Sequence, residues 1–531
     1  MWKLNWTELG IDWDRLKDVL TYDASQPMIF SSGFFLLLFL GFSLIYLILQ
    51  KKTTARLLFV TLFSYYFYYK SSGFYFFLLG IVTVSDFLLA RRMEQTVQSW
   101  KRKLLVVCSL CINLGLLCYF KYTNFFYEML APLWYGQFEP LDIFLPVGIS
   151  FFTFQSLSYT IDVYRRDLKP LTNLLDYAFY VSFFPQLVAG PIVRARDFIP
   201  QIRQPLFVSS EMFGQGIFFI VSGLFKKAVI SDYISVNFVE RIFDNPGLYS
   251  GLENLFGVYG YALQIYCDFS GYSDMAIGIA LLLGFRFPLN FDSPYKSDSV
   301  TDFWHRWHIT LGTWMKDYVF YPVTLSKWMG KFGKWGKKVF GKKTGRTLPI
   351  CLANLIVFFV VGVWHGAAWK YIVYGMYNGI IIAFSGLMAE HYRNWKKKFN
   401  ITGKENWYHV FMIIRTFILV NISWFFDRAD TVGQAFHMMK LSVTKFAPSQ
   451  LLLIPAGKEG TAFTPYALVI LAAGCIILFI VSVLQERGMK IRESLAGLSL
   501  PITVAIYFCL LASIGFFGST AVARGFIYAQ F

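Results

Sequence analysis

Apolar residues of this chain gather into separate blocks, many of them long enough to cross a lipid bilayer, with polar connections between them. A helix needs about 20 residues to span the hydrocarbon core. The pattern therefore predicts an all-α polytopic membrane protein of about eleven to twelve transmembrane or re-entrant helices. The predicted segments are residues 27–50, 57–69, 73–90, 104–120, 143–163, 174–189, 213–230, 255–283, 348–363, 368–388, 410–426, 467–484 and 500–517.

The connections between the blocks carry much of the charge. The predicted polar connections are residues 121–141, 330–346, 391–407 and 438–464, and the densest basic run is GKFGKWGKKVFGKKTGR at 330–346. One interpretation makes this run a cytoplasmic loop at an anionic leaflet. The other makes it a guide for an anionic donor such as the phosphates of coenzyme A.

The first 26 residues differ from the rest of the chain. They contain charged residues and no apolar core of the kind that a cleavable signal peptide has. Within them, Trp13 to Leu20 resembles an amphipathic helix lying at the membrane interface. We therefore predict two parts, a polar amino-terminal extension over 1–26 and a membrane domain over 27–531.

Composition also indicates a membrane protein. The chain is 56% hydrophobic and only 15% charged, which excludes a soluble multidomain enzyme, a disordered chain and a fibre. The net charge of +17 does not indicate nucleic-acid binding, because the basic residues stand between the apolar blocks. Lys51 and Lys52 follow the first block, and Arg91 and Arg92 follow the third, so the positive-inside rule places the amino terminus outside the cell.

One region breaks the hydropathy pattern. Between residues 266 and 322, ionisable groups stand within or beside apolar helix, at Asp268, Asp274, Asp302, His305, Arg306 and His308. Such groups are costly at membrane depth unless they are paired or face a cavity, so each is a functional candidate. The stretch Asp302 to Val319 is too polar for a lipid-facing span and is predicted to form a re-entrant or interfacial helix.

Two histidines stand out as candidate catalytic groups, His308 in FWHRWHITL and His365 in VVGVWHGAAW. His365 follows a long apolar run, and the small residues after it, beginning with Gly366, are expected to leave the imidazole open. A buried neutral histidine can accept a proton from a hydroxyl, as acyl transfer requires, but it can also be a hydrogen-bonded core residue.

A metal site is not predicted. His305 and His308 are spaced i, i+3, as on one helical face, but no third ligand is identifiable. The seven cysteines lie scattered in apolar runs, and the CxxC pair Cys108 and Cys111 has no second pair. The protein is therefore expected to hold no bound cofactor or metal.

Several motifs together resemble the membrane-bound O-acyltransferase superfamily, most closely its bacterial alginate O-acetyltransferase-like branch. They are MIFSS at 28–32, FFPQLVAGPIVR at 183–194, YCDFSGYSDMAIG at 266–278, NFDSPY at 290–295, DFWHRWHITL at 302–311, WHGAAW at 364–369 and FIYAQF at 526–531. The resemblance runs from about residue 27 to the end of the chain. It implies a fold in which membrane helices enclose a tunnel.

The resemblance also implies roles for individual residues. It assigns the principal catalytic role to His365 and a second, less defined site role to His308. His305 departs from the family pattern and receives no role. Two interpretations, helix packing and shaping of the tunnel or site, stay open for Asp268, Ser270, Tyr272, Asp274, Asp302, Trp304, Arg306, Trp307 and Trp364.

The implied function is an acyltransferase of the cell membrane, with several membrane passes. Its donor would be acetyl-CoA or another acyl thioester on the cytoplasmic side. Its acceptor would be an extracytoplasmic polysaccharide, reached through an extracytoplasmic acyl-accepting partner protein. The alternatives are D-alanyl transfer toward teichoic acid and, from a different class, a transporter without covalent chemistry.

Overall fold

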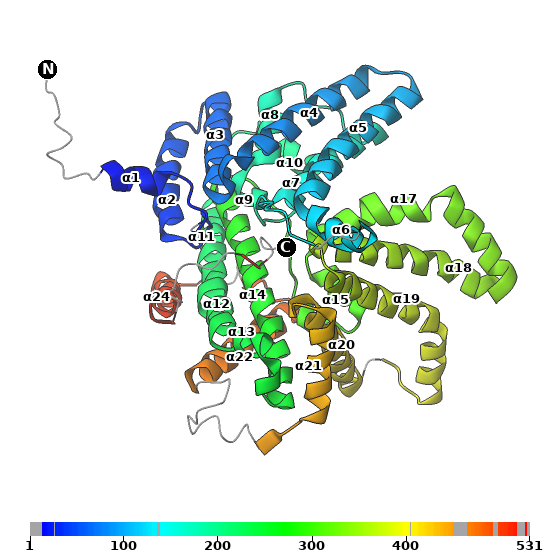
Figure 1. The fold of residues 1–531 in the computed structure, drawn as a ribbon. Helices are drawn as coiled ribbons and strands as arrows, with labels where there is room; N and C mark the ends of the chain where they lie inside the picture. The colour runs from blue at the N-terminus through cyan, green and yellow to red at the C-terminus, as the bar shows by residue number, and fades with distance from the viewer. Residues whose placement is uncertain are drawn as a thin grey trace, which may run out of the picture.

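The computed structural model of the protein describes residues 13–25, 27–134, 138–403, 405–449, 465–491, 498–517 and 526–527. In this part of the chain the secondary structure is helical, apart from one isolated bridge between Phe291 and Trp307. The all-α prediction is confirmed. Figure 1 shows α11 and α14 running side by side through the middle, while the α4–α5 pair and the α17–α19 group extend from the body.

The amino-terminal half is built of mostly short or medium helices. Their bounds are α1 Trp13–Leu20, α2 Gly33–Ile48, α3 Thr53–Ser72, α4 Phe76–Gln95, α5 Ser99–Leu117, α6 Thr123–Leu130, α7 Ile149–Arg165, α8 Leu174–Ser182, α9 Phe184–Leu187 and α10 Ala195–Ile202. The apolar segment predicted over 174–189 is divided into the separate helices α8 and α9. Pro185 has no backbone N–H and so cannot continue the hydrogen-bond ladder of α8.

The second half contains the longest helices. Their bounds are α11 Ser210–Phe225, α12 Asp232–Ile234, α13 Glu240–Asp244, α14 Gly251–Leu282, α15 Val300–Arg306, α16 Ile309–Met315, α17 Tyr321–Thr324, α18 Lys327–His365, α19 Trp369–Lys398, α20 Asn406–Arg428, α21 Val432–Thr444, α22 Pro465–Glu486 and α24 Leu500–Phe517. Three π-helical turns join some of them, η5 Lys226–Ser231, η6 Ser235–Val239 and η9 Lys316–Phe320.

Five stretches in the described part of the chain are long and apolar enough to cross a membrane. They are Thr53–Gln95, Ser99–Leu133, Lys327–His365, Trp369–Lys398 and Asn406–Arg428, and shorter apolar helices occur at Gly33–Ile48, Ala472–Glu486 and Pro501–Phe516. These helices confirm a multi-pass membrane protein. The total of eleven to twelve segments stays a prediction.

Helix α14 is the central element, and almost its whole length is buried. It begins with a capping box, in which the Ser250 hydroxyl accepts the Glu253 N–H and the Glu253 carboxylate accepts the Ser250 N–H. It packs closely on α11 because a Cβ at Gly223 would lie 2.5 Å from the carbonyl oxygen of Gly271. Small residues allow this close approach of two helix backbones.

Helix α18 corrects the prediction of a polar loop at 330–346. The segment is helical and turns at Gly341, where φ is 84° and ψ is 168°. A Cβ at Gly345 would lie 2.2 Å from the backbone nitrogen of Lys337, so the two arms of this hairpin pack backbone to backbone. The glycines that suggest a loop in the sequence instead permit this contact. Figure 1 shows the hairpin extending away from the body beside α19.

The single re-entrant helix predicted over Asp302 to Val319 is also wrong. Helix α15 ends at Arg306, Trp307 is extended, and His308 adopts a left-handed conformation before α16 begins. The neighbouring segment fills the break, because Asp292 N–H donates to the Arg306 carbonyl and Ile309 N–H donates to the Asn290 carbonyl. These bonds satisfy backbone groups that the interrupted helix leaves open.

The amino-terminal helix is confirmed, since α1 covers Trp13–Leu20 as predicted. The chain after it lies against the end of α3, where the Lys70 ammonium donates to the carbonyl oxygens of Val19, at 2.9 Å, and Thr21. The extension thus has a fixed contact with the membrane domain. The proposed division at residue 26 stays a prediction.

Candidate active site

His365 is the last residue of α18 and is buried, with 2% of its surface exposed. Its Nδ1 lies 3.4 Å from Oδ1 of Asp427, near the end of α20. The other oxygen of Asp427 accepts the Tyr261 hydroxyl at 2.7 Å. Because a carboxylate only accepts hydrogen bonds, it favours a proton on Nδ1 and leaves the Nε2 lone pair for another partner.

The surroundings of His365 correct the expectation of an open imidazole. A Cβ at Gly366 would lie 2.2 Å from the ring of Tyr371, so glycine makes room for this ring and not for solvent. Tyr374, which like Tyr371 belongs to α19, has its ring centroid 4.8 Å from that of the His365 imidazole. The last turn of α18 is held by Lys121, which donates to the Trp364 carbonyl, and by Tyr122, which donates to the Val363 carbonyl at 2.5 Å.

His308 stands at the break between α15 and α16, with φ 46° and ψ 53°. A left-handed conformation is costly for a residue with a side chain and is typical of functional sites that the surroundings enforce. Its Nδ1 lies 3.0 Å from the amide oxygen of Asn290, which also accepts the Thr310 hydroxyl at 2.9 Å. Since an amide oxygen only accepts, Nδ1 of His308 is the donor.

Trp364 lies between the two histidines. Its ring centroid is 5.7 Å from that of His308 and 5.2 Å from that of His365. Two imidazoles from distant parts of the sequence therefore share one aromatic neighbour inside the protein. Their catalytic roles stay predictions.

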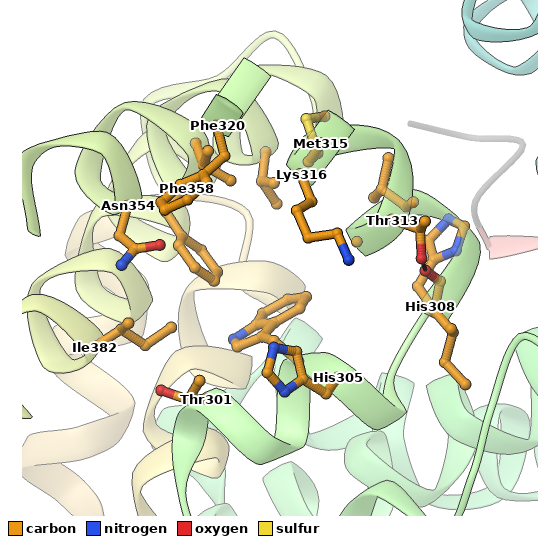
Figure 2. A pocket seen from close by; sticks show the side chains of 16 residues that line it. Thr301, His305, His308, Thr313, Met315, Lys316, Phe320, Asn354, Phe358 and Ile382 are labelled. Carbon is orange, nitrogen blue, oxygen red and sulfur yellow. Dashed lines mark hydrogen bonds between the residues drawn. The ribbon is translucent and has the colours of Figure 1, made fainter. Parts of the chain in front are cut away.

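A cavity of about 280 Å³ reaches His308 (Figure 2). It runs along α18 from Asn354 to Val361, and Asn354 precedes His365 by 11 residues, or about 16 Å of helix. The cavity thus lies on the side of His365 that leads back to the basic hairpin. Figure 2 shows the Lys316 side chain directed toward the space between Phe358 and His308. We call this the lysine-hairpin-side cavity.

A second cavity, of about 250 Å³, lies beyond the carboxyl-terminal end of α18. Asp427 and Tyr261 line it together with Lys370 and Tyr371, which belong to the first turn of α19. The Asp427 carboxylate thus faces both this cavity and His365. The lining is mainly polar, so we call this the polar cavity.

The predicted supporting residues of α14 contact lysines. Asp268 pairs with Lys227 at 2.6 Å, Asp274 pairs with Lys226 at 2.6 Å, and the Ser270 hydroxyl accepts from Lys226 at 3.3 Å. These contacts join α14 to η5. They favour helix packing over orientation of an imidazole.

The predicted aromatic and charged residues lie in three different surroundings. Trp304 lines the lysine-hairpin-side cavity and donates to Asn378 at 3.2 Å, whereas Trp364 contacts the two histidines. Tyr272, stacked 4.7 Å from Phe30, and Trp307, which is 1% exposed, are packed in the core. Asp302 and Arg306 pair with each other at 2.9 Å.

The proposed i, i+3 helical face for His305 and His308 is wrong, because α15 ends between them. His305 is exposed and lines the same cavity as His308. Among the residues that the structure describes, no group of three or more His, Cys, Asp or Glu side chains forms a candidate metal site.

Comparison with known proteins decides the family. The description MBOAT, membrane-bound O-acyltransferase family, matches residues 166–335 and 337–423. A peptidoglycan O-acetyltransferase of Helicobacter pylori is 31% identical over 486 residues, which are 84% of this chain and 86% of that protein. The chain belongs to the membrane-bound O-acyltransferase family. It is therefore an acyltransferase and a multi-pass membrane protein. The alternative of a transporter without covalent chemistry is wrong.

Other members of the family are similar over shorter stretches. A probable alginate O-acetylase of Azotobacter vinelandii is 34% identical over 371 residues, 68% of this chain and 67% of that protein. A teichoic acid D-alanyltransferase of Bacillus subtilis is 30% identical over 296 residues, 55% of this chain and 69% of that protein. The recognition of the superfamily and of its alginate O-acetyltransferase-like branch is confirmed.

Sequence reasoning missed two residues that the structure places beside the histidines. Asp427 follows the predicted segment 410–426 directly, and an acidic residue at the end of an apolar run is a signal that could have found it. Asn290 appeared only as the first letter of the NFDSPY motif. Its role beside His308 depends on the break at Trp307, which hydropathy does not reveal.

Proposed function

We propose that the protein transfers an acetyl group from a cytoplasmic thioester, acetyl-CoA, to a hydroxyl group of an extracytoplasmic polysaccharide. The observation that carries this proposal is the pair of buried histidines at Trp364, with one cavity that reaches His308 and a polar cavity that reaches Asp427, the carboxylate beside His365. The named activities of the Helicobacter pylori and Azotobacter vinelandii relatives support the acetyl group and the polysaccharide.

The two cavities suit different substrates. Lys316 and the basic residues of the α18 hairpin offer positive charge on the side where we expect the cytoplasm, which suits the phosphates of coenzyme A. The polar cavity offers hydroxyl, carboxylate and ammonium groups that suit a sugar hydroxyl or the side chain of an acyl-accepting partner protein. Continuity of the two cavities through the histidine pair is part of the proposal.

In the proposed step His365 is the general base. Nε2 takes the proton of the acceptor hydroxyl while that oxygen forms a bond to the thioester carbonyl carbon. The carbon–sulfur bond then breaks, and the proton passes from His365 to the departing thiolate, so the products are an ester and a free thiol. Asp427 stabilises the imidazolium that exists between these two proton transfers.

His308 has a different part in the proposal. Its Nδ1–H donates a hydrogen bond to Asn290, so Nε2 is the acceptor nitrogen. Through Nε2 the ring accepts a hydrogen bond from one substrate and orients that substrate against Trp364. The Asp427 carboxylate lies 3.4 Å from Nδ1 of His365, and we therefore assign proton uptake to His365.

Purified full-length protein incubated with acetyl-CoA carrying a labelled acetyl group, or with a labelled D-alanyl carrier protein, tests the donor. Chito-oligosaccharide or alginate oligomer serves as the acceptor probe, with and without a membrane extract that supplies partner proteins. We expect labelled oligosaccharide from acetyl-CoA and none from the D-alanyl carrier. The reverse preference would replace this proposal by D-alanyl transfer, for which the Bacillus subtilis relative is the precedent.

A further inference from the structure

The first arm of the α18 hairpin, residues 327–340, has no assigned role in the steps described so far. It ends at the turn at Gly341 and is about 21 Å long, which is too short to span a bilayer. Its residues are not among the described residues that line the lysine-hairpin-side cavity. Figure 1 shows the hairpin extending from the body of the protein. This arm is therefore a surface element of the hairpin.

Three rows of side chains follow the arm, each at the helical spacing i, i+4, i+7. They are an inner row, an apolar row and a basic row. In that order their members are Met329, Gly333 and Gly336; Trp328, Phe332, Trp335 and Val339; and Lys327, Lys331, Lys334 and Lys338. Neighbouring rows differ by one residue, or about 100° of rotation around the helix. Each row thus occupies its own face of the arm.

The inner row fixes the orientation of the arm. Its three residues are buried against the second arm of the hairpin. A Cβ at Gly333 would lie 3.1 Å from the Pro349 ring, and one at Gly336 would lie 3.0 Å from the Leu348 side chain. Because glycine allows this close packing, the apolar and basic rows are held on the outer faces.

The apolar row presents aromatic surface to the outside. Trp328 is 58% exposed and Trp335 is 51% exposed. The half-buried Phe332 joins them, since its ring is stacked 6.1 Å from Trp328 and 5.5 Å from Trp335. The three rings form one continuous apolar strip. Tryptophan is enriched where a membrane protein meets the boundary between lipid and water.

The basic row lies directly beside this strip. All four of its lysines are exposed, and none of them pairs with a carboxylate among the described residues; the ion pair of the hairpin is that of Lys343 with Glu390. Residues 327–346 contain seven lysines, one arginine and no acidic residue. Lysine side chains at the edge of an apolar surface can extend their ammonium groups to a neighbouring polar layer.

We propose that the first arm binds the surface of an anionic phospholipid leaflet. The apolar row enters the acyl region, and the basic row binds the lipid phosphates. An aromatic face beside a lysine face is typical of helices that lie at a membrane interface. Charge complementarity selects an anionic headgroup such as phosphatidylglycerol.

The apolar row also argues against a soluble anion as the occupant, because a soluble anion would leave the exposed tryptophans in water. The proposal does not rest on acetyl transfer. It concerns the first arm alone. The second arm, with Lys342 and Arg346, continues into the part of α18 that lines the lysine-hairpin-side cavity, where we place the thioester donor.

Hydrogen–deuterium exchange of the full-length protein in lipid nanodiscs tests the proposal. One preparation contains phosphatidylcholine alone, and the other contains an equal mixture with phosphatidylglycerol. We expect the backbone N–H groups of peptide 327–340 to exchange several-fold more slowly in the mixture. High salt should reduce this difference, because salt screens exposed charges.

Two quadruple variants with the same loss of charge assign the effect to the basic row. The first carries Lys327→Gln, Lys331→Gln, Lys334→Gln and Lys338→Gln. The control carries Lys51→Gln, Lys52→Gln, Lys101→Gln and Lys103→Gln, at four exposed lysines outside the hairpin. We expect the first variant to lose the effect of phosphatidylglycerol and the control to keep it. If the first variant does not fold, its two halves, at 327 and 331 and at 334 and 338, should each lose part of the effect.

A second pair of variants tests the apolar row. Trp328→Ser combined with Trp335→Ser removes the exposed rings, whereas Trp328→Phe combined with Trp335→Phe keeps aromatic surface. We expect the serine variant to exchange several-fold faster than wild type over 327–340 in both kinds of nanodisc. The phenylalanine variant should stay within about twofold of wild type, because it still buries its rings in lipid.

The outcomes are decisive without any measurement of acyl transfer. Equal exchange of the wild-type peptide in the two membranes, or the same slowing in the basic-row variant, would overturn the proposal. Slowing by coenzyme A added to phosphatidylcholine nanodiscs, with none by phosphatidylglycerol, would assign the basic row to the phosphates of the donor and would also overturn it. Failure of the proposed acetyl transfer would leave the lipid effect unchanged.

Discussion

The surroundings of the two buried histidines differ in one respect that matters for chemistry. The Nδ1 partner of His365 is the carboxylate of Asp427, whose other oxygen accepts a hydrogen bond from the Tyr261 hydroxyl. His308 has a neutral amide as its Nδ1 partner, Asn290. Both partners select the same tautomer, with Nε2 as the acceptor.

The difference appears when a proton arrives. An imidazole that takes a proton becomes a cation, and a cation buried in a membrane protein is costly without a nearby anion. Asp427 provides that anion for His365, whereas Asn290 provides only a dipole for His308. Burial and position in the sequence make the two histidines look alike, and the difference between their partners is the reason why we propose His365 as the base.

The largest effect is expected for loss of the base. His365→Ala should lower kcat for acetyl transfer about 10²- to 10⁴-fold, because it removes the proposed base together with its contact to the Asp427 carboxylate. The measurement is acetyl transfer by protein whose thermal unfolding in detergent matches wild type. A folded His365→Ala protein with wild-type kcat would refute the assignment.

A somewhat smaller loss is expected for Asp427→Asn. If the Asn oxygen keeps the Tyr261 hydroxyl, the new NH₂ faces Nδ1 of His365 and forces the proton to Nε2, where it blocks the base. We expect kcat to fall about 100-fold with little change in thioester KM. Tyr261→Phe removes only the hydrogen bond to Asp427 and serves as the control, with a loss of at most about tenfold.

His308→Ala should impair transfer partially, about tenfold, since this ring orients a substrate and does not take the proton. Steady-state kinetics should show the loss partly in KM, unlike the loss in His365→Ala. Equal losses in kcat alone for both histidine variants would break the comparison between them.

The smallest effect is expected for Asn290→Ala, which removes the acceptor of the His308 N–H and the Thr310 hydroxyl. We expect a several-fold loss of kcat/KM and a lower unfolding temperature, because the side-chain oxygen of Asn290 also accepts the Thr310 N–H at 3.3 Å, just after the break between α15 and α16. Asn290→Asp keeps an acceptor oxygen for His308 and Thr310 but loses the NH₂ group that donates to Ser273 at 3.0 Å. It should therefore recover part of kcat/KM, and an Asn290→Asp protein no more active than Asn290→Ala would show that the acceptor oxygen does not position His308.

The sequence was informative where a local pattern of apolar residues decides the structure. Trp13–Leu20 is helical as its apolar spacing predicts, and apolar runs located most of the long helices. The helical hairpin at 330–346 was missed because lysine and glycine are typical of loops, whereas here Gly345 allows two helices to touch. That contact is tertiary, and no local pattern encodes it.

The candidate site shows the same limit. His308 and His365 could be singled out because ionisable residues at membrane depth are rare. Their pairing across Trp364 and the partners Asp427 and Asn290 depend on how α18, α20 and the α15–α16 break pack together. Sequence reasoning left a site-shaping role open for Asp268 and Asp274 beside the structural role that it favoured, and their lysine partners appear only in the fold.

The central claim is that Asp427 acts through His365. A double-mutant cycle tests it most directly, with kcat for acetyl transfer measured for wild type, His365→Ala, Asp427→Asn and the double variant. If the claim is right, Asp427→Asn costs about 100-fold in the wild-type background and nothing further, within about twofold, in the His365→Ala background. An additional loss of about 100-fold in the double variant would show that Asp427 acts independently of His365 and would contradict the account.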